Sequence, residues 1–243
     1  MTPRITAAVA ARVLRQIRRD RRTLALLLVL PCLLITLLWW MFRDTPVFDQ
    51  VGPALLAMFP FIVMFLVTSV TTLRERSSGT LERLLAMPMG KLDFLVGYAV
   101  AFGLVAAVQA ALAVGLSVGL LDLEVIGPVW LLFVVAVVDA VLGTALGLFV
   151  SAFAQTEFQA VQFMPAVVIP QILLCGLFLP RDQLPDALHW ISDLLPLSYA
   201  VDAMTTLTTS AETGDVWADL AVVAGFAVAG LAAGAATLRR RTP

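Results

Sequence analysis

Long hydrophobic runs, separated by short polar segments, occupy most of this chain. Six runs reach the roughly 20 residues that a helix needs to cross a bilayer core about 30 Å thick. These predicted spans are Thr23 to Phe42, Val51 to Leu73, Leu92 to Leu121, Val129 to Phe153, Ala160 to Leu179 and Val216 to Leu238. They lack the alternation of apolar and polar residues that outer-membrane barrels show. Because only helices and closed barrels satisfy the backbone in lipid, the pattern predicts an all-α, polytopic membrane protein with six transmembrane helices.

The composition also indicates a membrane protein. Of the 243 residues, 60% are hydrophobic and 14% are charged, and the mean hydropathy is +0.96, which excludes an ordinary soluble domain. Cys32 and Cys175 both lie inside apolar spans, and the single histidine, His189, has no partner at a metal-binding spacing. We therefore expect no metal site, no catalytic residues and no nucleic-acid partner.

Basic residues gather on one side of the predicted membrane. Seven arginines precede the first span, four basic residues lie between the second and third spans, and three arginines follow the sixth. Only Arg43 and Arg181 lie on the other side. Since short loops rich in arginine and lysine stay in the cytoplasm, we expect both termini to be cytoplasmic. Arginine at every basic position except Lys91, with abundant alanine, is typical of a GC-rich genome, so we expect the cytoplasmic (inner) membrane of a bacterium.

The amino-terminal segment, residues 1–22, is predicted to be an amphipathic helix. Ile5, Val9, Val13 and Ile17 recur every four residues and form one apolar stripe, with arginines between them. We expect this helix to lie along the cytoplasmic surface of the membrane. Two interpretations remain open: a basic flank that only sets topology and attracts anionic lipid, or a helix that also contacts a cytoplasmic partner.

The connection between the second and third spans is longer than a turn requires. It runs for eighteen residues, from Arg74 to Lys91. Gly79 can cap a helix, an acidic residue follows in the first turn, and Pro88 ends the helix. This short cytoplasmic helix would present one leucine face, formed by Leu81, Leu84 and Leu85. Such a face fits either lipid or a docking cleft on another protein.

Two stretches resemble a known family. The sequence ERSSGTLERLLAMP, from Glu75 to Pro88, resembles the E-R-x-x-G-T-L-E-x-L-L-x-x-P signature of ABC-2 type transporter permeases, including the daunorubicin-resistance-like exporters. The second stretch has five shorter pieces: PQ at Pro170, LLCG at Leu173, Pro180, QLP at Gln183 and LLPLSYAVDA from Leu194 to Ala203. Together with the six-span pattern, the resemblance covers nearly the whole chain.

The resemblance implies a six-span transmembrane domain over residues 23–243, with residues 1–22 as a connecting helix. It also implies that a coupling helix at about 74–88 docks into a separate ABC ATPase subunit, which would bind ATP and Mg²⁺. The residues that would contact this subunit are Glu75, Arg76, Gly79, Thr80, Leu81, Glu82, Arg83, Leu84, Leu85 and Pro88. Because the family works as a dimer, we expect a second permease copy, forming a homodimer, and two ATPase subunits, with membrane lipid around the bundle.

Between the fifth and sixth spans, residues 180–200 form an outer segment with apolar residues at helical spacing. Pro185 stands at a helix start and Asp186 in its first turn. The segment is either a helix that dips into the outer leaflet or an amphipathic loop on the outer surface. By resemblance it is a re-entrant outer gate, with these candidate residues: Pro180, Leu184, Leu188, Ile191, Pro196 and Tyr199.

Polar residues inside the predicted spans are candidates for a substrate path: Asp139, Gln159, Gln162 and Gln171. Asp139 lies near the middle of the fourth span, where an ionisable group is costly. It is either a substrate or proton site, or a structural group hydrogen-bonded to a neighbour such as Gln109, Thr144 or Gln162. Three glycine pairs permit close helix approach without identifying the contacts: Gly115 with Gly119, Gly143 with Gly147, and Gly230 with Gly234.

The sequence lacks a phosphate-binding loop of the form G-x-x-x-x-G-K-[ST]. Gly90 and Lys91 are followed by Leu92, and Leu85 stands where the first glycine is required. We therefore expect no ATP hydrolysis and no cofactor in this chain itself. The leading hypothesis is the permease subunit of an ATP-driven exporter that moves an amphipathic or lipid-like substrate or drug outward. The alternative is a proton-coupled secondary transporter that uses Asp139.

Overall fold

The structure is a computed structural model that describes residues 3–77 and 91–237. Its described regular elements are all helices, and six of them are long and apolar enough to cross a membrane. The six are α2 (Arg21–Phe42), α3 (Val47–Ser77), α5 (Lys91–Gly119), α6 (Val129–Val150), α7 (Glu157–Leu174) and α10 (Gly214–Thr237). The prediction of an all-α membrane protein with six spans is confirmed.

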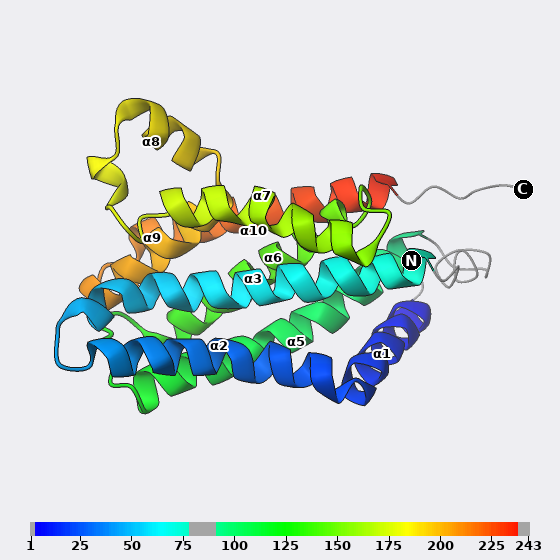
Figure 1. Ribbon diagram of the computed structural model, residues 1–243, viewed down its shortest axis with the longest axis horizontal. Coiled ribbons are helices and arrows are strands. Elements are labelled where there is room, and N and C mark those ends of the chain that lie inside the picture. The colour runs from blue at the N-terminus through cyan, green and yellow to red at the C-terminus, as the bar shows by residue number, and fades with distance from the viewer. Residues whose placement is uncertain (1–2, 78–90, 238–243) are drawn as a thin grey trace, which may run out of the picture.

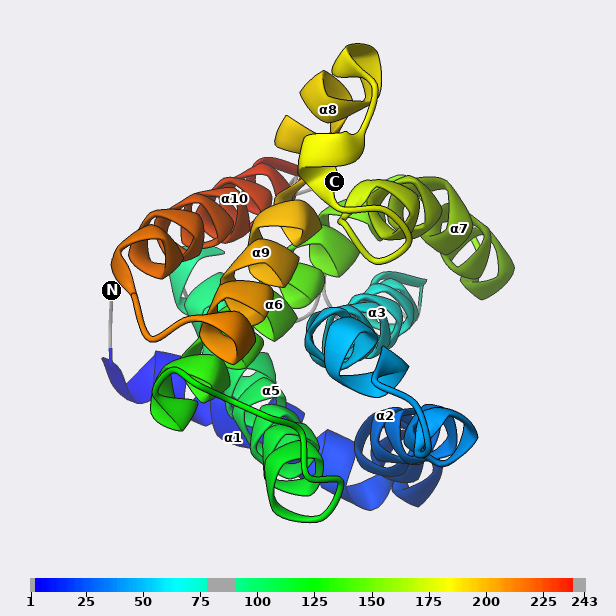
Figure 2. The same cartoon turned by 90° about the vertical axis from the view of Figure 1, so that its left-hand side faces the viewer.

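The six long helices run side by side along the long axis of the molecule (Figure 1). α6 lies in the centre and contacts α3, α5 and α10 (Figure 2). The starts of α2, α5 and α7 and the ends of α3 and α10 lie at one end of the bundle, which we call the N-terminal end. The α2–α3 turn and the α5–α6 connection lie at the opposite end.

Capping side chains fix the first turns of two spans at the N-terminal end. One carboxyl oxygen of Asp20 accepts hydrogen bonds from the backbone amides of Arg22 and Thr23, and the other accepts one from the Thr23 hydroxyl. These hydrogen bonds lower the pKa of Asp20 below its ordinary value, and the bond from the Thr23 hydroxyl has the largest effect. Thr156 caps α7 through the amide of Gln159. These caps replace partners that the first N–H groups of a helix lack.

The fifth span is shorter than predicted. The apolar run continues to Leu179, but α7 ends at Leu174. Gly176 has a φ of 96°, a left-handed conformation that glycine adopts without strain, and the chain turns there. Hydropathy does not register this turn, because the residues that follow the glycine are as apolar as the helix before it.

Between α7 and α10 the chain forms η1 (Arg181–Gln183), α8 (Asp186–Asp193) and α9 (Pro196–Thr209). α8 begins after Pro185, as predicted, and stands away from the bundle (Figure 2). α9 lies inside the bundle against α3, α6 and α10, and the sequence analysis did not identify it as a separate helix. It is shorter than a span and rich in threonine, so hydropathy alone does not mark it.

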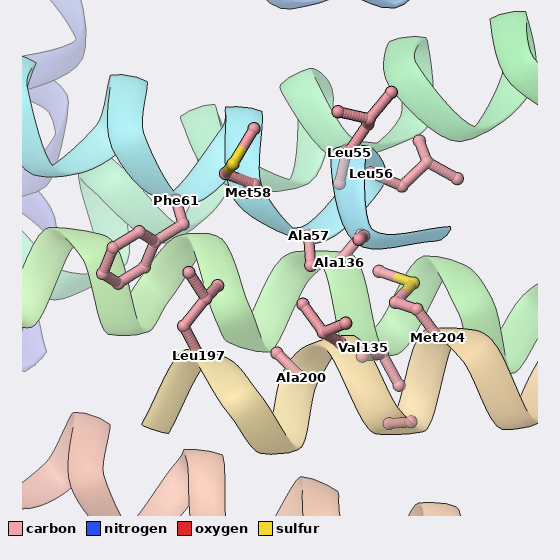
Figure 3. Close-up of a cluster of buried hydrophobic side chains, with 14 of the residues drawn as sticks. Leu55, Leu56, Ala57, Met58, Phe61, Val135, Ala136, Leu197, Ala200 and Met204 are labelled. Atoms are coloured by element: carbon pink, nitrogen blue, oxygen red, sulfur yellow. The ribbon is translucent and has the colours of Figure 1, made fainter. Parts of the chain in front are cut away.

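The main hydrophobic core lies where α3, α6 and α9 meet (Figure 3). Buried side chains of Phe61, Val135, Leu197 and Met204 pack together there. Gly143 brings α6 directly against α3, because a Cβ at this position would overlap the carbonyl oxygen of Phe61. The absence of a side chain is therefore what permits the closest helix approach in this part of the core.

The amphipathic helix predicted at the amino terminus is present as α1 (Pro3–Arg19). Val9, Val13 and Ile17 of its apolar stripe are buried in a cluster shared with α2, α3 and α5. A Cβ on Gly97 of α5 would come within 2.7 Å of the Val9 Cβ, so the two helices are in close contact. The apolar stripe therefore packs on protein, and the position of α1 along the cytoplasmic surface of the membrane stays a prediction.

Candidate functional site

Most of the predicted partner-binding residues lie outside the described residues. These are Gly79, Thr80, Leu81, Glu82, Arg83, Leu84, Leu85 and Pro88. For Arg76 only the backbone position, within α3, is described. Their contact with an ATPase stays a prediction. What the structure does describe is how the two ends of this segment are held.

α1 contacts both helices that flank residues 78–90. Near the end of α3, Glu75 is 4% exposed, and Arg12 Nη2 donates a hydrogen bond to its Oε1 over 3.0 Å. Near the start of α5, the Thr6 hydroxyl donates a hydrogen bond to Asp93 Oδ1 over 3.3 Å. α1 is thus bonded to the chain shortly before and shortly after the segment. A displacement of either flanking helix acts on α1.

An ion pair joins α3 to α7 at the same end of the bundle. Arg74 Nε and Nη2 donate to the two carboxylate oxygens of Glu157 over 2.8 and 3.1 Å. Two parallel bonds fix direction as well as distance. Both side chains are about half exposed, so solvent weakens the pair, and its main effect is to orient the two helices. The end of α3 is therefore connected to both α1 and α7.

Sequence reasoning did not find Arg12, Asp93 or Glu157. Asp93 and Glu157 are charged and lie near the edge of an apolar run, which is a weak signal for a contact at the membrane boundary, whereas Arg12 lies within the amphipathic α1. The partners are 63 to 87 residues apart along the chain, so the pattern alone does not pair them. Glu75 was expected to face a partner subunit. The structure gives it a contact within the chain, and its role toward a partner stays a prediction.

Asp139 has no exposed surface, and neither carboxyl oxygen has a hydrogen-bond partner among the described residues. Gln109 of α5 is equally buried, and both of its amide atoms lack a partner within the same part of the chain. Gln109 lies ten residues before the end of α5, and Asp139 lies ten residues after the start of α6. Because these two helix ends lie at the same end of the bundle, the two residues are at similar depth. The Thr144 hydroxyl, another expected partner, bonds to the Ala140 carbonyl instead. Buried polar groups without partners are rare and often mark functional sites.

The glutamines of α7 have different surroundings. Gln171 is buried, and its Oε1 accepts the backbone amide of Leu197 over 3.3 Å, which joins α7 to the start of α9. Gln159 and Gln162 are exposed, and Gln159 accepts the backbone amide of Gln155 over 2.8 Å. The candidates for a substrate path therefore do not form one site within a single chain.

At the opposite end, Arg181 holds η1, α8 and α9 together. Its guanidinium donates hydrogen bonds to Asp202, to Asp193 over 2.6 Å and to the Ser192 hydroxyl over 2.9 Å. It also lies 5.0 Å from the ring centre of Tyr199. Burial lowers the pKa of Arg181, but the charges of Asp202 and Asp193 outweigh burial and raise this pKa above its ordinary value. The arginine therefore stays charged at physiological pH.

The predicted outer-gate residues divide between two environments. Those on or beside η1 and α8 are exposed or half-buried: Pro180, Leu184, Leu188 and Ile191. Pro196 is buried at the first position of α9, and the Tyr199 hydroxyl donates to the Asp193 carbonyl over 2.9 Å. α8 thus keeps an apolar face free, as a helix at the surface of a leaflet does. The other two residues belong to the packed bundle.

A cavity of about 1020 Å³ opens at the same end, lined by the start of α3, by α9 and by residues 176–182. Carboxylates dominate its charged lining: Asp49, Glu124, Asp182 and Asp202. Arg181 also lines it, but two carboxylates already pair with this arginine. The cavity is therefore acidic.

The sequence model of the ABC-2 type transporter family matches residues 5–208. The chain belongs to this family. The match extends from α1 to α9 and includes both stretches on which the resemblance was first drawn, so the identification of the family is confirmed. Membership of the daunorubicin-resistance-like group stays a prediction. It also places α1 inside the family domain, although α1 is not among the helices that are long and apolar enough to cross a membrane.

Curated relatives align with about three fifths of this ABC-2 chain. It is 29% identical over 152 residues to the probable multidrug ABC transporter permease YbhR of Escherichia coli strain K12, covering 63% of this chain and 41% of the relative. It is 26% identical over 156 residues to ABC transporter G family member 20 of Dictyostelium discoideum, covering 64% of this chain and 21% of the relative. The inner membrane transport permease YhhJ of Escherichia coli strain K12 is 26% identical to this chain over 141 residues, covering 58% of this chain and 38% of the relative. The aligned part is less than half the length of each relative.

Proposed function

We propose that this chain is the permease subunit of an ATP-driven exporter, energised by a separate ABC ATPase that docks at the N-terminal end of the bundle. The observation that carries the proposal is the ABC-2 family match over residues 5–208, which contains the signature from Glu75 to Pro88. The sequence has no phosphate-binding loop, so ATP and Mg²⁺ would bind to the partner. The cargo would be an amphipathic or lipid-like compound or drug.

The contacts at the N-terminal end support a route for mechanical coupling. Because α1 is bonded to Glu75 and Asp93, a movement of segment 78–90 would act on α1, α3 and α5 together. The ion pair between Arg74 and Glu157 would extend this movement to α7. In the proposed mechanism, ATP binding draws the partner subunits together, and these helices respond as one body.

The distribution of charge supports a cytoplasmic position for the N-terminal end. Within its 17 residues α1 carries five arginines and no acidic residue. Short segments with this composition stay on the cytoplasmic side, which for a bacterial chain is the inner face of the inner membrane. In this orientation the acidic cavity beside Arg181 would open outward and serve as the exit for cargo.

A second copy of the chain would complete the transport path. α7 is the least apolar of the six candidate spans, yet it is among the least buried. α2 is buried to the same extent but is much more apolar, so lipid suits it. Gln162 on the exposed face of α7 would be costly in lipid. We therefore propose that α7 helices of two copies face each other, with Gln159 and Gln162 lining the path between them.

Affinity purification of the chain from its native membrane in mild detergent tests this function. We expect an ATPase to copurify in equal amount and to hydrolyse ATP. Glu82→Lys, or Leu84→Asp with Leu85→Asp, should abolish this association while the chain remains inserted in the membrane. Arg43→Gln, at the opposite end, is the matched control and should leave it intact. Normal ATPase association and transport in both docking variants would contradict the proposed docking site.

One alternative, a proton-coupled secondary transporter, is favoured by the Asp139 carboxyl, which has no hydrogen-bond partner among the residues that the structure describes. Asp139→Asn removes the ionisable group with little change of volume. For the exporter, ATP-dependent transport by proteoliposomes that contain the variant and its ATPase should persist. Transport that needs no ATPase, follows an imposed proton gradient and disappears in Asp139→Asn would establish the alternative.

A further inference from the structure

A groove at the N-terminal end lies between α1, α2 and α3. The groove has a volume of about 210 Å³. Much of its lining consists of apolar side chains of two spans: Leu26, Leu30, Val63, Leu66, Val67 and Val70. Asp20 and Arg74, which have opposite charges, line its mouth. Leu26 is 57% exposed and Leu30 is 37% exposed, so the described chain does not fill the groove.

A basic hollow adjoins the mouth of this groove. Arg12, Arg15, Gln16 and Arg19 line it along one flank of α1, and its volume is about 420 Å³. Gln16 lines both cavities, so they are neighbours. Arg12 is paired with Glu75, but no carboxylate in the described part of the chain pairs with Arg15 or Arg19. The hollow therefore carries positive charge that no carboxylate of residues 3–77 and 91–237 pairs with, apart from Glu75 on Arg12.

The depth of the groove matches one leaflet of a bilayer. From Thr23 to Leu30 it follows α2 for seven residues, and from Arg74 to Val63 it follows α3 for eleven. At about 1.5 Å per residue these distances are about 10 and 16 Å. Half of a hydrocarbon core about 30 Å thick is about 15 Å. The polar mouth then lies at the level of the headgroups.

We propose that this groove binds a phospholipid with an anionic headgroup, taken from the leaflet at the N-terminal end. The phosphate contacts Arg15 and Arg19, whose guanidinium groups suit phosphate oxygens, and one acyl chain fills the space between α2 and α3. A soluble anion would leave the apolar part empty. A neutral lipid such as phosphatidylcholine also carries a phosphate, but its choline cation would add positive charge beside the two arginines, so the net charge there would stay positive. The bound lipid would hold α1 against α2 and α3. The proposal goes beyond the exporter function and holds without an ATPase.

Native mass spectrometry of the full chain in mild detergent tests the proposal. The chain is titrated with dioleoyl phosphatidylglycerol, and with dioleoyl phosphatidylcholine as the neutral probe. Arg15→Gln with Arg19→Gln should weaken binding of the first phosphatidylglycerol on the order of tenfold and change phosphatidylcholine binding little. The matched control is Arg18→Gln with Arg21→Gln, two exposed arginines that line neither cavity, and it should keep the wild-type affinity.

The apolar part of the site has its own pair of variants. Leu26→Trp should obstruct the groove and weaken binding of both lipids. Leu33→Trp, on the same helix, replaces a side chain that is 54% exposed and does not line the groove, so binding should not change. If the arginine variants unfold, comparing Leu26→Trp with Leu33→Trp still tests whether the lipid binds in the groove.

Three results would overturn the proposal. Equal loss of phosphatidylglycerol binding in the two double arginine variants would indicate a general basic surface. Displacement of the lipid by sn-glycerol 3-phosphate at the same concentration as phosphatidylglycerol would indicate a site for soluble anions. Wild-type binding in Leu26→Trp, or equal loss in Leu33→Trp, would show that the acyl chain does not lie between α2 and α3.

Discussion

At the scale of single residues, charges near the membrane boundary are balanced by partners that are distant in sequence. Glu75 is almost completely buried, and α1 supplies the guanidinium of Arg12 to it. At the opposite end the burial is reversed, because the Arg181 side chain is 12% exposed whereas those of Asp193 and Asp202 are 43% and 38% exposed. A buried charge that loses its partner costs more free energy than the intact pair contributes. Both sets of partners are therefore required even where the net gain from each pair is small.

We expect Arg12→Ala to lower the free energy of unfolding by about 2 kcal/mol, because the Glu75 carboxylate loses its guanidinium. This figure is below that for a fully buried pair because the Arg12 side chain is 32% exposed. Arg18→Ala, on the exposed surface of the same helix, should change the free energy by less than about 0.5 kcal/mol. Thermal unfolding in detergent, followed by tryptophan fluorescence, measures both. Equal unfolding temperatures for the two variants would count against a stabilising role of this pair.

Arg181→Lys keeps the positive charge but loses the planar fork that reaches Asp202, Asp193 and Ser192 together. We expect amide hydrogen exchange in residues 180–195 to accelerate by about tenfold, which corresponds to about 1.4 kcal/mol of local stability. Exchange in α2 should stay as in the wild type and serves as the internal control. Unchanged exchange in 180–195 would mean that charge alone holds η1 and α8.

At the scale of elements, the three pairs of glycines spaced four residues apart do not all lie at helix contacts. Gly143 and Gly147 of α6 face carbonyl oxygens of α3 so closely that a Cβ on either would overlap them. The pair on α10 packs on α6. Gly115 and Gly119 of α5 have no atom within 4 Å of the position that a Cβ would take. The spacing of four residues places two glycines on one helix face, but the face that meets another helix depends on the whole bundle.

The glycine pairs give a direct test of the α3–α6 contact. Gly143→Ala and Gly147→Ala should each lower the free energy of unfolding by about 1 to 3 kcal/mol, since backbone atoms of α3 must move. Gly115→Ala should leave stability unchanged or raise it by up to about 1 kcal/mol, because alanine favours the helix and meets no neighbour. Thermal unfolding of the three variants distinguishes these outcomes. Equal effects at all three positions would contradict the described helix contact.

At the scale of the whole molecule, α2 and α7 are equally little buried but differ in how apolar they are. α2 is highly apolar and little buried, which suits contact with lipid. α7 is equally little buried but less apolar, and it carries Gln162 on its exposed face. This mismatch supports the proposal that a second copy of the chain covers α7.

Disulfide cross-linking in membranes tests the proposed dimer. In a background of Cys32→Ala and Cys175→Ala, we expect Gln162→Cys on α7 to form cross-linked dimers on oxidation. Val228→Cys on α10 is the control: its side chain is 66% exposed but lies on a span that is more apolar than α7. This control should stay monomeric. Cross-linking of the control alone, or of both variants equally, would rule out α7 as the specific dimer contact.

The apolar pattern and the signature were enough to predict the class of fold, the six spans, the helical character of α1 and the family. Bilayer thickness fixes the length of an apolar run, and the segment from Glu75 to Pro88 is long enough to be specific. The contacts in the folded chain were needed to show that α1 packs on α5, that Arg12 pairs with Glu75, and that α9 lies inside the bundle. The physical reason is that periodicity shows which face of a helix is apolar, whereas the neighbour of that face depends on contacts between distant parts of the chain.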